Sequence, residues 1–217
     1  IIVETCLAWF RQGVVKAPAW IKETLLLADQ NVRAAAKADA SRAGMGATAA
    51  LILIENGRLY TGHVGDARIY RFRNDELTQI TRDHSLVAEL VARGDLTEEA
   101  SRTHPQKNVV LQAVGTGSGV SPEVSAKGER LLPGDRILVC SDGLNDALHD
   151  SEIAACLRGV GDTAAACNAL CADALNAGAS DNVSIGLFDA RIHAAAPAGV
   201  NSPLAETGDI VLEGAFS

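Results

Sequence analysis

The sequence predicts an α+β fold with mainly antiparallel sheets. Helix-forming and strand-forming segments come in blocks along the 217 residues instead of alternating strictly, as is typical of α+β proteins. Two apolar strand segments, 48–55 and 59–64, are joined through Asn56-Gly57, a strong hairpin signal. With 47% hydrophobic and 21% charged residues, the chain has the composition of a globular protein with room for a substantial core.

The other elements follow from periodicity and capping residues. Val3, Leu7 and Phe10 recur at helical spacing, Pro18 suits the first turn of a helix, and Ser151 is expected to cap one. Helices are therefore expected at residues 1–12, 19–39, 84–93, 97–102, 151–158 and 162–176. Further strands are expected at residues 69–73, 76–80, 109–114, 121–126, 136–141 and 182–189.

Two regions depart from this regular pattern. The polar stretch between Asp83 and Val110 has no strand character and is longer than most loops, which favours a functional or mobile segment. Residues 192–217 are rich in Ala, Pro and Gly, and we expect a flexible tail or linker there. Residues 1–191 would then form the folded domain. Because the chain opens at Ile1 inside a helical pattern, we also expect a segment to precede it.

Charge and cysteine content limit the classes of partner. The formal net charge is -8, with a pI of about 5.1, and lysines and arginines form no cluster, so we expect no nucleic-acid partner. No apolar stretch approaches the ~20 residues needed to span a bilayer, so we expect no membrane role. An odd number of cysteines, five, indicates reduced thiols and a cytoplasmic location. Cys167 and Cys171 share a helix face, where core packing is favoured over a metal site.

Three aspartates stand in short, sharply defined settings. They are Asp66 in Gly-Asp-Ala-Arg, Asp142 in Ser-Asp-Gly and Asp181 in Ser-Asp-Asn. Carboxylates delivered by apolar strands are suitable ligands for Mg²⁺ or Mn²⁺, which prefer oxygen. The alternative is that each aspartate forms a turn, as Asp-Gly and Asp-Asn pairs often do. Three such sites in this order favour the metal.

At these residues the chain resembles the metal-dependent serine/threonine protein phosphatases of the PPM (PP2C-like) type, in their bacterial form. The resemblance covers about residues 1–190, and its six motifs occur in the family's order. They are Gly44–Thr48, His63–Tyr70, Thr81–Ser85, His104–Leu111 with Gly115, Ser141–Leu144 with Asp146, and Ser180–Ser184.

The resemblance implies an α-β-β-α sandwich of two mainly antiparallel sheets flanked by helices, with the first strands missing. It implies hydrolysis of phosphoserine and phosphothreonine in proteins by a metal-activated water. Two Mn²⁺ or Mg²⁺ ions would serve the complete protein, and members of the family bind a third. The implied partners are a phosphoprotein substrate and a serine/threonine kinase with its targets.

The family's site residues transfer to matching positions only. Asp142 and Asp181 would hold the two ions, and Asp66 would join Asp142 at the third, weaker site. Asn182 and Ser141 would hold these carboxylates in place. The flap, a segment beside the active site, would include Asp83, His84 and Ser85. Arg68 is expected to pair with a carboxylate inside the fold, and we assign no histidine as general acid.

The family's upstream acidic motifs are not found in this chain. We therefore expect an incomplete pair of metal sites and weak metal binding, and the activity of this chain alone stays open. The alternative to an enzyme is a non-catalytic module that binds a phosphoprotein or a kinase.

Overall fold

The computed structural model describes residues 1–13, 16–192 and 210–216. These residues form two compact units, each described by itself. Unit 1 comprises residues 1–53, 60–69 and 79–127, and unit 2 comprises residues 54–59, 70–78 and 128–217. The chain passes between the units several times, so both units contain residues that are far apart in the sequence.

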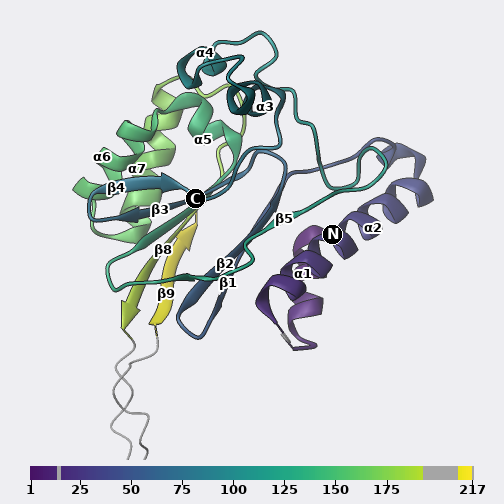
Figure 1. The fold of residues 1–217 in the computed structure, drawn as a ribbon, viewed down its shortest axis with the longest axis horizontal. Coiled ribbons are helices and arrows are strands. Elements are labelled where there is room, and N and C mark those ends of the chain that lie inside the picture. The colour runs from purple at the N-terminus through teal and green to yellow at the C-terminus, as the bar shows by residue number, and fades with distance from the viewer. Residues whose placement is uncertain (14–15, 193–209, 217) are drawn as a thin grey trace, which may run out of the picture. The chain divides into compact units, whose positions relative to one another are not determined.

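Unit 1 begins with two helices, α1 (Ile2–Phe10) and α2 (Ala17–Ala38), which pack side by side (Figure 1). Strands β1 (Ala49–Glu55) and β2 (Arg58–Val64) follow the short 3₁₀ helix η1 (Ala40–Arg42). Trp20, Ile21 and Leu25 of α2 are buried in one cluster with apolar side chains of β1. The apolar stripe of α2 therefore covers a face of this sheet.

The segment after residue 79 completes unit 1. Helices α3 (Leu86–Arg93) and α4 (Glu98–Arg102) precede β5 (Glu123–Val124). Strand β5 pairs with β2 in antiparallel register, with His63 opposite Glu123. The sheet order is β1-β2-β5.

Unit 2 is built on the sheet β4-β3-β7-β8-β9. The strands are β3 (Arg68–Arg73), β4 (Glu76–Gln79), β7 (Arg136–Cys140), β8 (Ile185–Ile192) and β9 (Ile210–Phe216). The short strand β6 (Glu129–Arg130) pairs with the start of β2. The pairs β7–β8 and β8–β9 are antiparallel.

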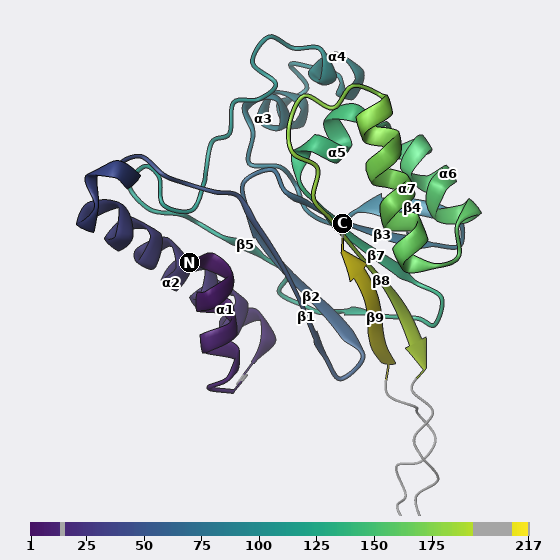
Figure 2. The ribbon, with the colours of Figure 1, turned by 180° about the vertical axis from the view of Figure 1, so that it is seen from behind.

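Three helices cover one face of this sheet: α5 (Asp142–Ala147), α6 (Asp150–Gly159) and α7 (Thr163–Asn176) (Figure 2). Buried residues of all three form one cluster with side chains of β3, β7 and β8. Two buried arginine–aspartate pairs stabilise the unit. Asp135 accepts two hydrogen bonds of 2.6 Å from Arg73. Arg136 contacts Asp189 and donates to the carbonyl groups that end α6.

The expected α+β fold is confirmed, and most expected elements are present within a few residues of their bounds. The hairpin at Asn56-Gly57 is also confirmed: both residues have positive φ, 52° and 68°, as a type I′ turn requires. No strand forms over residues 109–114, where Val110 and Val114 make only isolated bridges. Residues 109–114 have no neighbouring strand in the described part of the chain to pair with along their length, so their apolar sequence alone did not produce a strand.

Three further differences concern element ends. The cap of α6 is His149, whose backbone N–H donates to Glu152, so the expectation of a Ser151 cap is wrong. Helix α5, beginning at Asp142, was not expected. Strand β9 lies within 192–217, where the sequence favours a flexible tail, because its apolar residues find a partner in β8. Residues 193–209 of the expected tail lie outside the described part of the chain.

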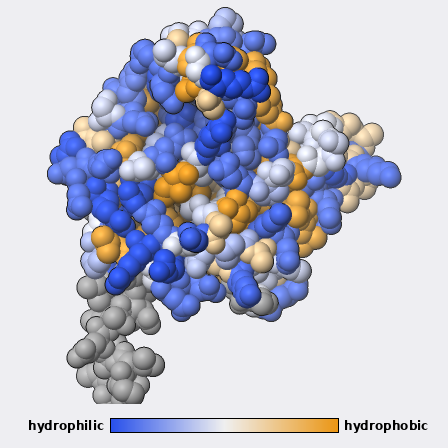
Figure 3. All heavy atoms as spheres, in the orientation of Figure 1, coloured by the Kyte–Doolittle hydropathy of each residue, from blue (hydrophilic) through white to orange (hydrophobic). Residues whose placement is uncertain are grey.

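None of the helices that the structure describes has the length and apolar character to cross a bilayer. On the face shown in Figure 3, apolar side chains form small patches separated by hydrophilic ones. The largest exposed fractions among apolar side chains include those of Val3 in α1 and Phe216 in β9.

Candidate metal centre

Asp142 and Asp181 come together because of the strand pairing in unit 2. Strand β7 ends at Cys140, which lies opposite Ile185, the first residue of β8. In an antiparallel pair the chain leaving one strand lies beside the chain entering the next. The segment after β7, with Asp142, therefore lies next to the segment before β8, with Asp181.

Hydrogen bonds join these two segments directly. The Ser141 hydroxyl donates to the Asn182 carbonyl at 3.1 Å and accepts from the Ser184 N–H at 3.0 Å. The Ser141 N–H donates to the Ser184 carbonyl at 3.0 Å. A Cβ at Gly143 would overlap the carbonyl oxygen of Asn182, so glycine is required for this close approach.

The structure thus gives Ser141 and Asn182 specific positions. Ser141 holds the backbone that carries Asp181 and does not bond to either carboxylate. The Asn182 N–H donates to the Asp181 carboxylate at 2.7 Å. Asn182 thus supports a carboxylate directly, through its backbone N–H, whereas Ser141 acts only on the backbone of the neighbouring segment.

The surroundings of Asp142 disfavour the negative charge of its carboxylate. Asp142 is half-buried, and Asp181 is exposed. Burial raises the pKa of Asp142 above its usual value, and the negative charges of Asp181 and Asp146 raise it further. No lysine or arginine of the described residues forms an ion pair with Asp142 or Asp181. A divalent cation would offset both the repulsion and the desolvation.

This donor set fits Mg²⁺ or Mn²⁺. Both ions prefer carboxylate oxygens, and here the segments that carry two carboxylates lie side by side, one after the end of β7 and one before the start of β8. Without a counter-ion, burial and the neighbouring negative charges disfavour the charged form of Asp142. The fit therefore rests on the raised pKa of Asp142 and on the absence of a cationic side chain beside it in the described residues.

Two neighbours of Asp142 were not singled out as site residues from the sequence. Asn145 is 4% exposed, and its side-chain oxygen accepts no hydrogen bond from the described residues. Asp146, interpreted from the sequence as structural, contributes to the raised pKa of Asp142. Both lie in α5, within about one turn of Asp142. Recognising this helix from the sequence would have indicated them.

Asp66 lies in unit 1, whereas Asp142 and Asp181 lie in unit 2. Its surroundings are therefore described within unit 1. It follows β2 and is half-buried. The preceding Gly65 has a φ of 101°, and a Cβ there would overlap Thr48. Glycine is thus needed at the turn that places Asp66.

The three expected flap residues have well-defined structural contacts. Asp83 accepts hydrogen bonds from Arg68 at 2.7–3.1 Å and from Gln79 at 3.0 Å, which confirms the internal pairing expected for Arg68. Ser85 caps α3 by accepting from the Ala88 N–H at 3.3 Å. The backbone N–H of His84 donates to the Gly65 carbonyl at 2.9 Å. These residues therefore anchor the start of α3.

Comparison with known proteins finds a family model and relatives that match this chain. Residues 10–90 match the protein-family model described as protein phosphatase 2C. The serine/threonine protein phosphatase PstP of Mycobacterium tuberculosis (strain CDC 1551 / Oshkosh) is 40% identical over 146 residues, which cover 67% of this chain and 28% of the relative. Protein phosphatase PhpP of Streptococcus pneumoniae serotype 2 (strain D39 / NCTC 7466) is 34% identical over 168 residues, which cover 77% of this chain and 67% of the relative.

Solved structures agree with this result. A crystal structure of the catalytic domain of PstP in complex with two manganese ions matches with a TM-score of 0.73 and 29% identity. The match covers 86% of this chain and 78% of that domain. The chain thus spans little more than a quarter of the curated PstP relative but most of the solved catalytic domain.

Proposed function

The chain belongs to the protein phosphatase 2C family, and we propose that its activity is the metal-dependent hydrolysis of phosphoserine and phosphothreonine in proteins. The observation that carries the proposal is the Asp142–Asp181 pair, held together by Ser141 and lacking a cationic partner in the described residues. The manganese-bound PstP relative supports Mn²⁺ or Mg²⁺ as the cofactor.

In the proposed mechanism, the carboxylates of Asp142 and Asp181 would hold the divalent ions. Such ions lower the pKa of water and neutralise phosphoryl oxygens. The role of the protein is to keep the two carboxylates at a fixed separation, which the Ser141 contacts with Asn182 and Ser184 achieve. The net reaction adds water at phosphorus and releases the serine or threonine hydroxyl and inorganic phosphate, without a phosphoenzyme.

Asp66 is proposed as a ligand of a further ion, because its motif matches that of the family. The proposed partners are phosphoproteins and a serine/threonine kinase that produces them. We also propose a cytoplasmic location, supported by the five cysteines, which form no disulfide among themselves. The non-catalytic alternative has no support from the relatives described above, whose names denote phosphatases.

The experiment is hydrolysis of p-nitrophenyl phosphate and of a phosphothreonine peptide with Mn²⁺, with Mg²⁺ and with EDTA. It uses this chain and, where the coding sequence continues upstream of Ile1, the longer version as well. Asp142→Asn should lower metal-dependent turnover of the active version by more than about 100-fold, since residues that merely support metal ligands already cost about 10–100-fold.

Asp173→Asn, an exposed aspartate on α7, is the matched control and should leave turnover unchanged. Equal activity of Asp142→Asn and wild type would overturn the site assignment. Activity that persists in EDTA would contradict the proposed dependence on a metal ion. If neither version hydrolyses either substrate, the proposed reaction is wrong and a binding module takes its place.

A further inference from the structure

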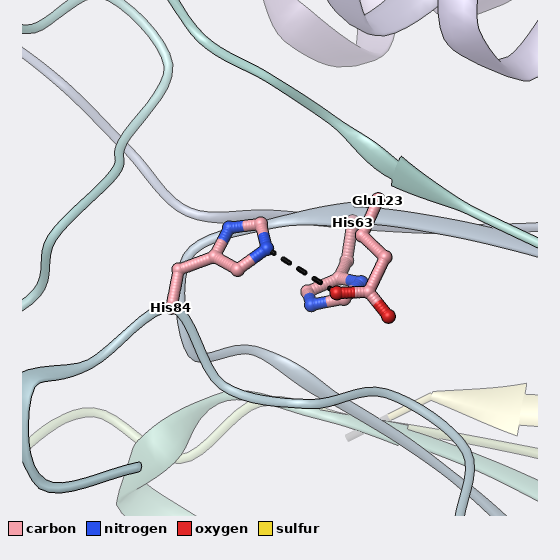
Figure 4. Close-up of side chains that lie close together, drawn as sticks. All are labelled: His63, His84 and Glu123. Atoms are coloured by element: carbon pink, nitrogen blue, oxygen red, sulfur yellow. Dashed lines mark ion pairs between the residues drawn. The ribbon is translucent and has the colours of Figure 1, made fainter. Parts of the chain in front are cut away.

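A second group of side chains suited to a metal ion lies wholly within unit 1. His63 of β2, His84 before α3 and Glu123 of β5 each offer one ligand atom, and these atoms lie within 4.8 Å of one another (Figure 4). His63 and Glu123 are direct partners across the β2–β5 pair. Directly opposite residues project from the same face of a sheet, so the strand register itself places this imidazole beside this carboxylate.

His63 has one ring nitrogen engaged and one remaining. It is 2% exposed, and its Nε2 lies 2.7 Å from the Arg82 carbonyl oxygen. A carbonyl can only accept, so Nε2 is the donor, and the neutral ring in this tautomer has its lone pair on Nδ1. Histidines that bind metals commonly donate their other N–H to a carbonyl group in this way, which fixes the ring and its tautomer.

His84 is held on both sides. Its backbone N–H donates to the Gly65 carbonyl, and its own carbonyl accepts from the Leu111 N–H at 2.7 Å. Its ring stacks on that of His63 with centroids 4.6 Å apart, and its Nε2 lies 3.7 Å from a carboxylate oxygen of Glu123. Burial and then the neighbouring His63 lower the pKa of His84, which favours the neutral form that metals bind.

We propose that His63, His84 and Glu123 form a binding site for one transition-metal ion, with Zn²⁺ preferred over Mg²⁺ and Mn²⁺. Two imidazoles and one carboxylate are a ligand set that Zn²⁺ uses, whereas Mg²⁺ favours sites made of oxygen alone. A three-ligand site leaves a position for water. This inference does not depend on the proposed phosphatase activity, because it uses none of the aspartates assigned to that activity.

Two costs limit the affinity of this site. Ligands about 2.0–2.2 Å from one ion lie closer together than 4.8 Å, so the group must contract; Glu123 can move because it is 57% exposed. The Gly65 N–H donates to Nδ1 of His84 at 3.2 Å, and coordination through Nε2 transfers the ring proton to Nδ1 and breaks this bond. We therefore expect weaker binding than at a structural zinc site with four protein ligands.

A bound ion would join three elements that are adjacent in unit 1. His63 belongs to β2, Glu123 to β5, and His84 immediately precedes Ser85, the cap of α3. Fixing His84 restrains the start of α3 and the segment that follows it. The expected effect of Zn²⁺ is therefore a rise in melting temperature and slower amide exchange at α3, with a local change at Gly65.

The experiment is a calorimetric titration with Zn²⁺ of a background variant carrying Asp142→Asn and Asp181→Asn, which removes the other candidate site. Glu123→Gln should weaken Zn²⁺ binding by at least about tenfold, and His84→Gln should do the same. Glu99→Gln, an exposed carboxylate on α4, is the matched control. Because the chain has five cysteines, Co²⁺ serves as a spectroscopic probe: imidazole and carboxylate ligands give visible bands without thiolate charge transfer.

Equal Zn²⁺ affinity in Glu123→Gln and the background variant would overturn the proposal, as would a thiolate band in the Co²⁺ spectrum. Mg²⁺ binding of equal strength that Glu123→Gln abolishes would contradict the preferred metal. If His84→Gln fails to fold, Glu123→Gln still decides, because its side chain is mostly exposed and the substitution preserves its shape.

Discussion

Strand β7 has an aspartate beyond each end, and the two differ in their surroundings. Asp135 precedes the strand, is 1% exposed and accepts two hydrogen bonds from Arg73. Asp142 follows the strand, is half-buried, and lies near Asp181 and Asp146, without an ion pair to lysine or arginine among the described residues. The same residue type is thus structural where a guanidinium compensates it, and suited to a cation where further carboxylates surround it.

The difference teaches how to separate stabilising aspartates from ligand aspartates. A buried charge is tolerated when it is paired and hydrogen-bonded. Where that pairing is missing, the protein accepts a cost to stability that a ligand can relieve. Four substitutions test this rule, from the largest expected loss of stability to none.

The largest effect is expected for Asp135→Ala. This change removes the acceptor of two short Arg73 hydrogen bonds, leaving that guanidinium, among the described residues, only the more distant Glu129 carboxylate at 3.7 Å, and it leaves the Leu132 N–H without its acceptor. Removing one partner of a buried pair costs about 3–5 kcal/mol. Urea denaturation followed by circular dichroism measures the free energy of unfolding. A loss below about 1 kcal/mol would show that the pair does not stabilise unit 2.

Asp83→Asn is expected to have an intermediate effect. Asp83 is 11% exposed and accepts hydrogen bonds from Arg68 and Gln79. Hydrogen bonds to charged groups contribute about 1.5–3 kcal/mol, and the amide retains part of them. Thermal unfolding compared with that of Asp135→Ala measures the difference. A larger loss of stability in Asp83→Asn than in Asp135→Ala would show that burial does not determine the size of the effect.

Asp75→Asn should have a small effect. Asp75 pairs with Arg158 at 3.2 Å, but its side chain is 70% exposed. Exposed ion pairs contribute about 0–1 kcal/mol and weaken with salt. Denaturation at low and high salt should give nearly equal free energies for wild type and variant. A salt-independent loss larger than 1 kcal/mol would contradict the comparison.

Asp142→Asn should not destabilise the protein in EDTA. The raised pKa of Asp142 means that the folded state disfavours its charge, chiefly because of burial and then because of Asp181 and Asp146. A neutral amide removes this penalty, so the free energy of unfolding should stay equal or rise by up to about 1 kcal/mol. With Mn²⁺ added, the melting temperature should rise for the wild type and not for the variant.

Destabilisation of the variant in EDTA would place Asp142 in the same class as Asp135. A Mn²⁺-induced rise of equal size in both proteins would mean that the ion binds elsewhere.

The sequence predicted much of the fold because its signals were local. Asn56-Gly57 specified the hairpin by conformation alone, and Pro18 indicated the first turn of α2. By contrast, β9 depends on pairing with β8, a long-range contact that composition does not reveal. Val109–Leu111 is apolar but lies outside any strand, because only Val110 makes a bridge.

The candidate site was predictable to the same extent. Short motifs indicated Asp142 and Asp181 as candidates, and the structure shows the β7–β8 register that brings their two segments together. Asn145 and Asp146 were missed as contributors because helix α5 was not expected. The His63–Glu123 pairing depends on the register of β5 against β2. A strand of two residues is too short for its sequence to predict this register.

The most direct test of the central claim is a Mn²⁺ titration followed by electron paramagnetic resonance, comparing the wild-type chain with Asp142→Asn. The account predicts that the wild type takes up Mn²⁺ and that Asp142→Asn, while folded, binds it at least about tenfold more weakly. Equal Mn²⁺ binding by the two proteins would contradict the assignment of Asp142 as a metal ligand.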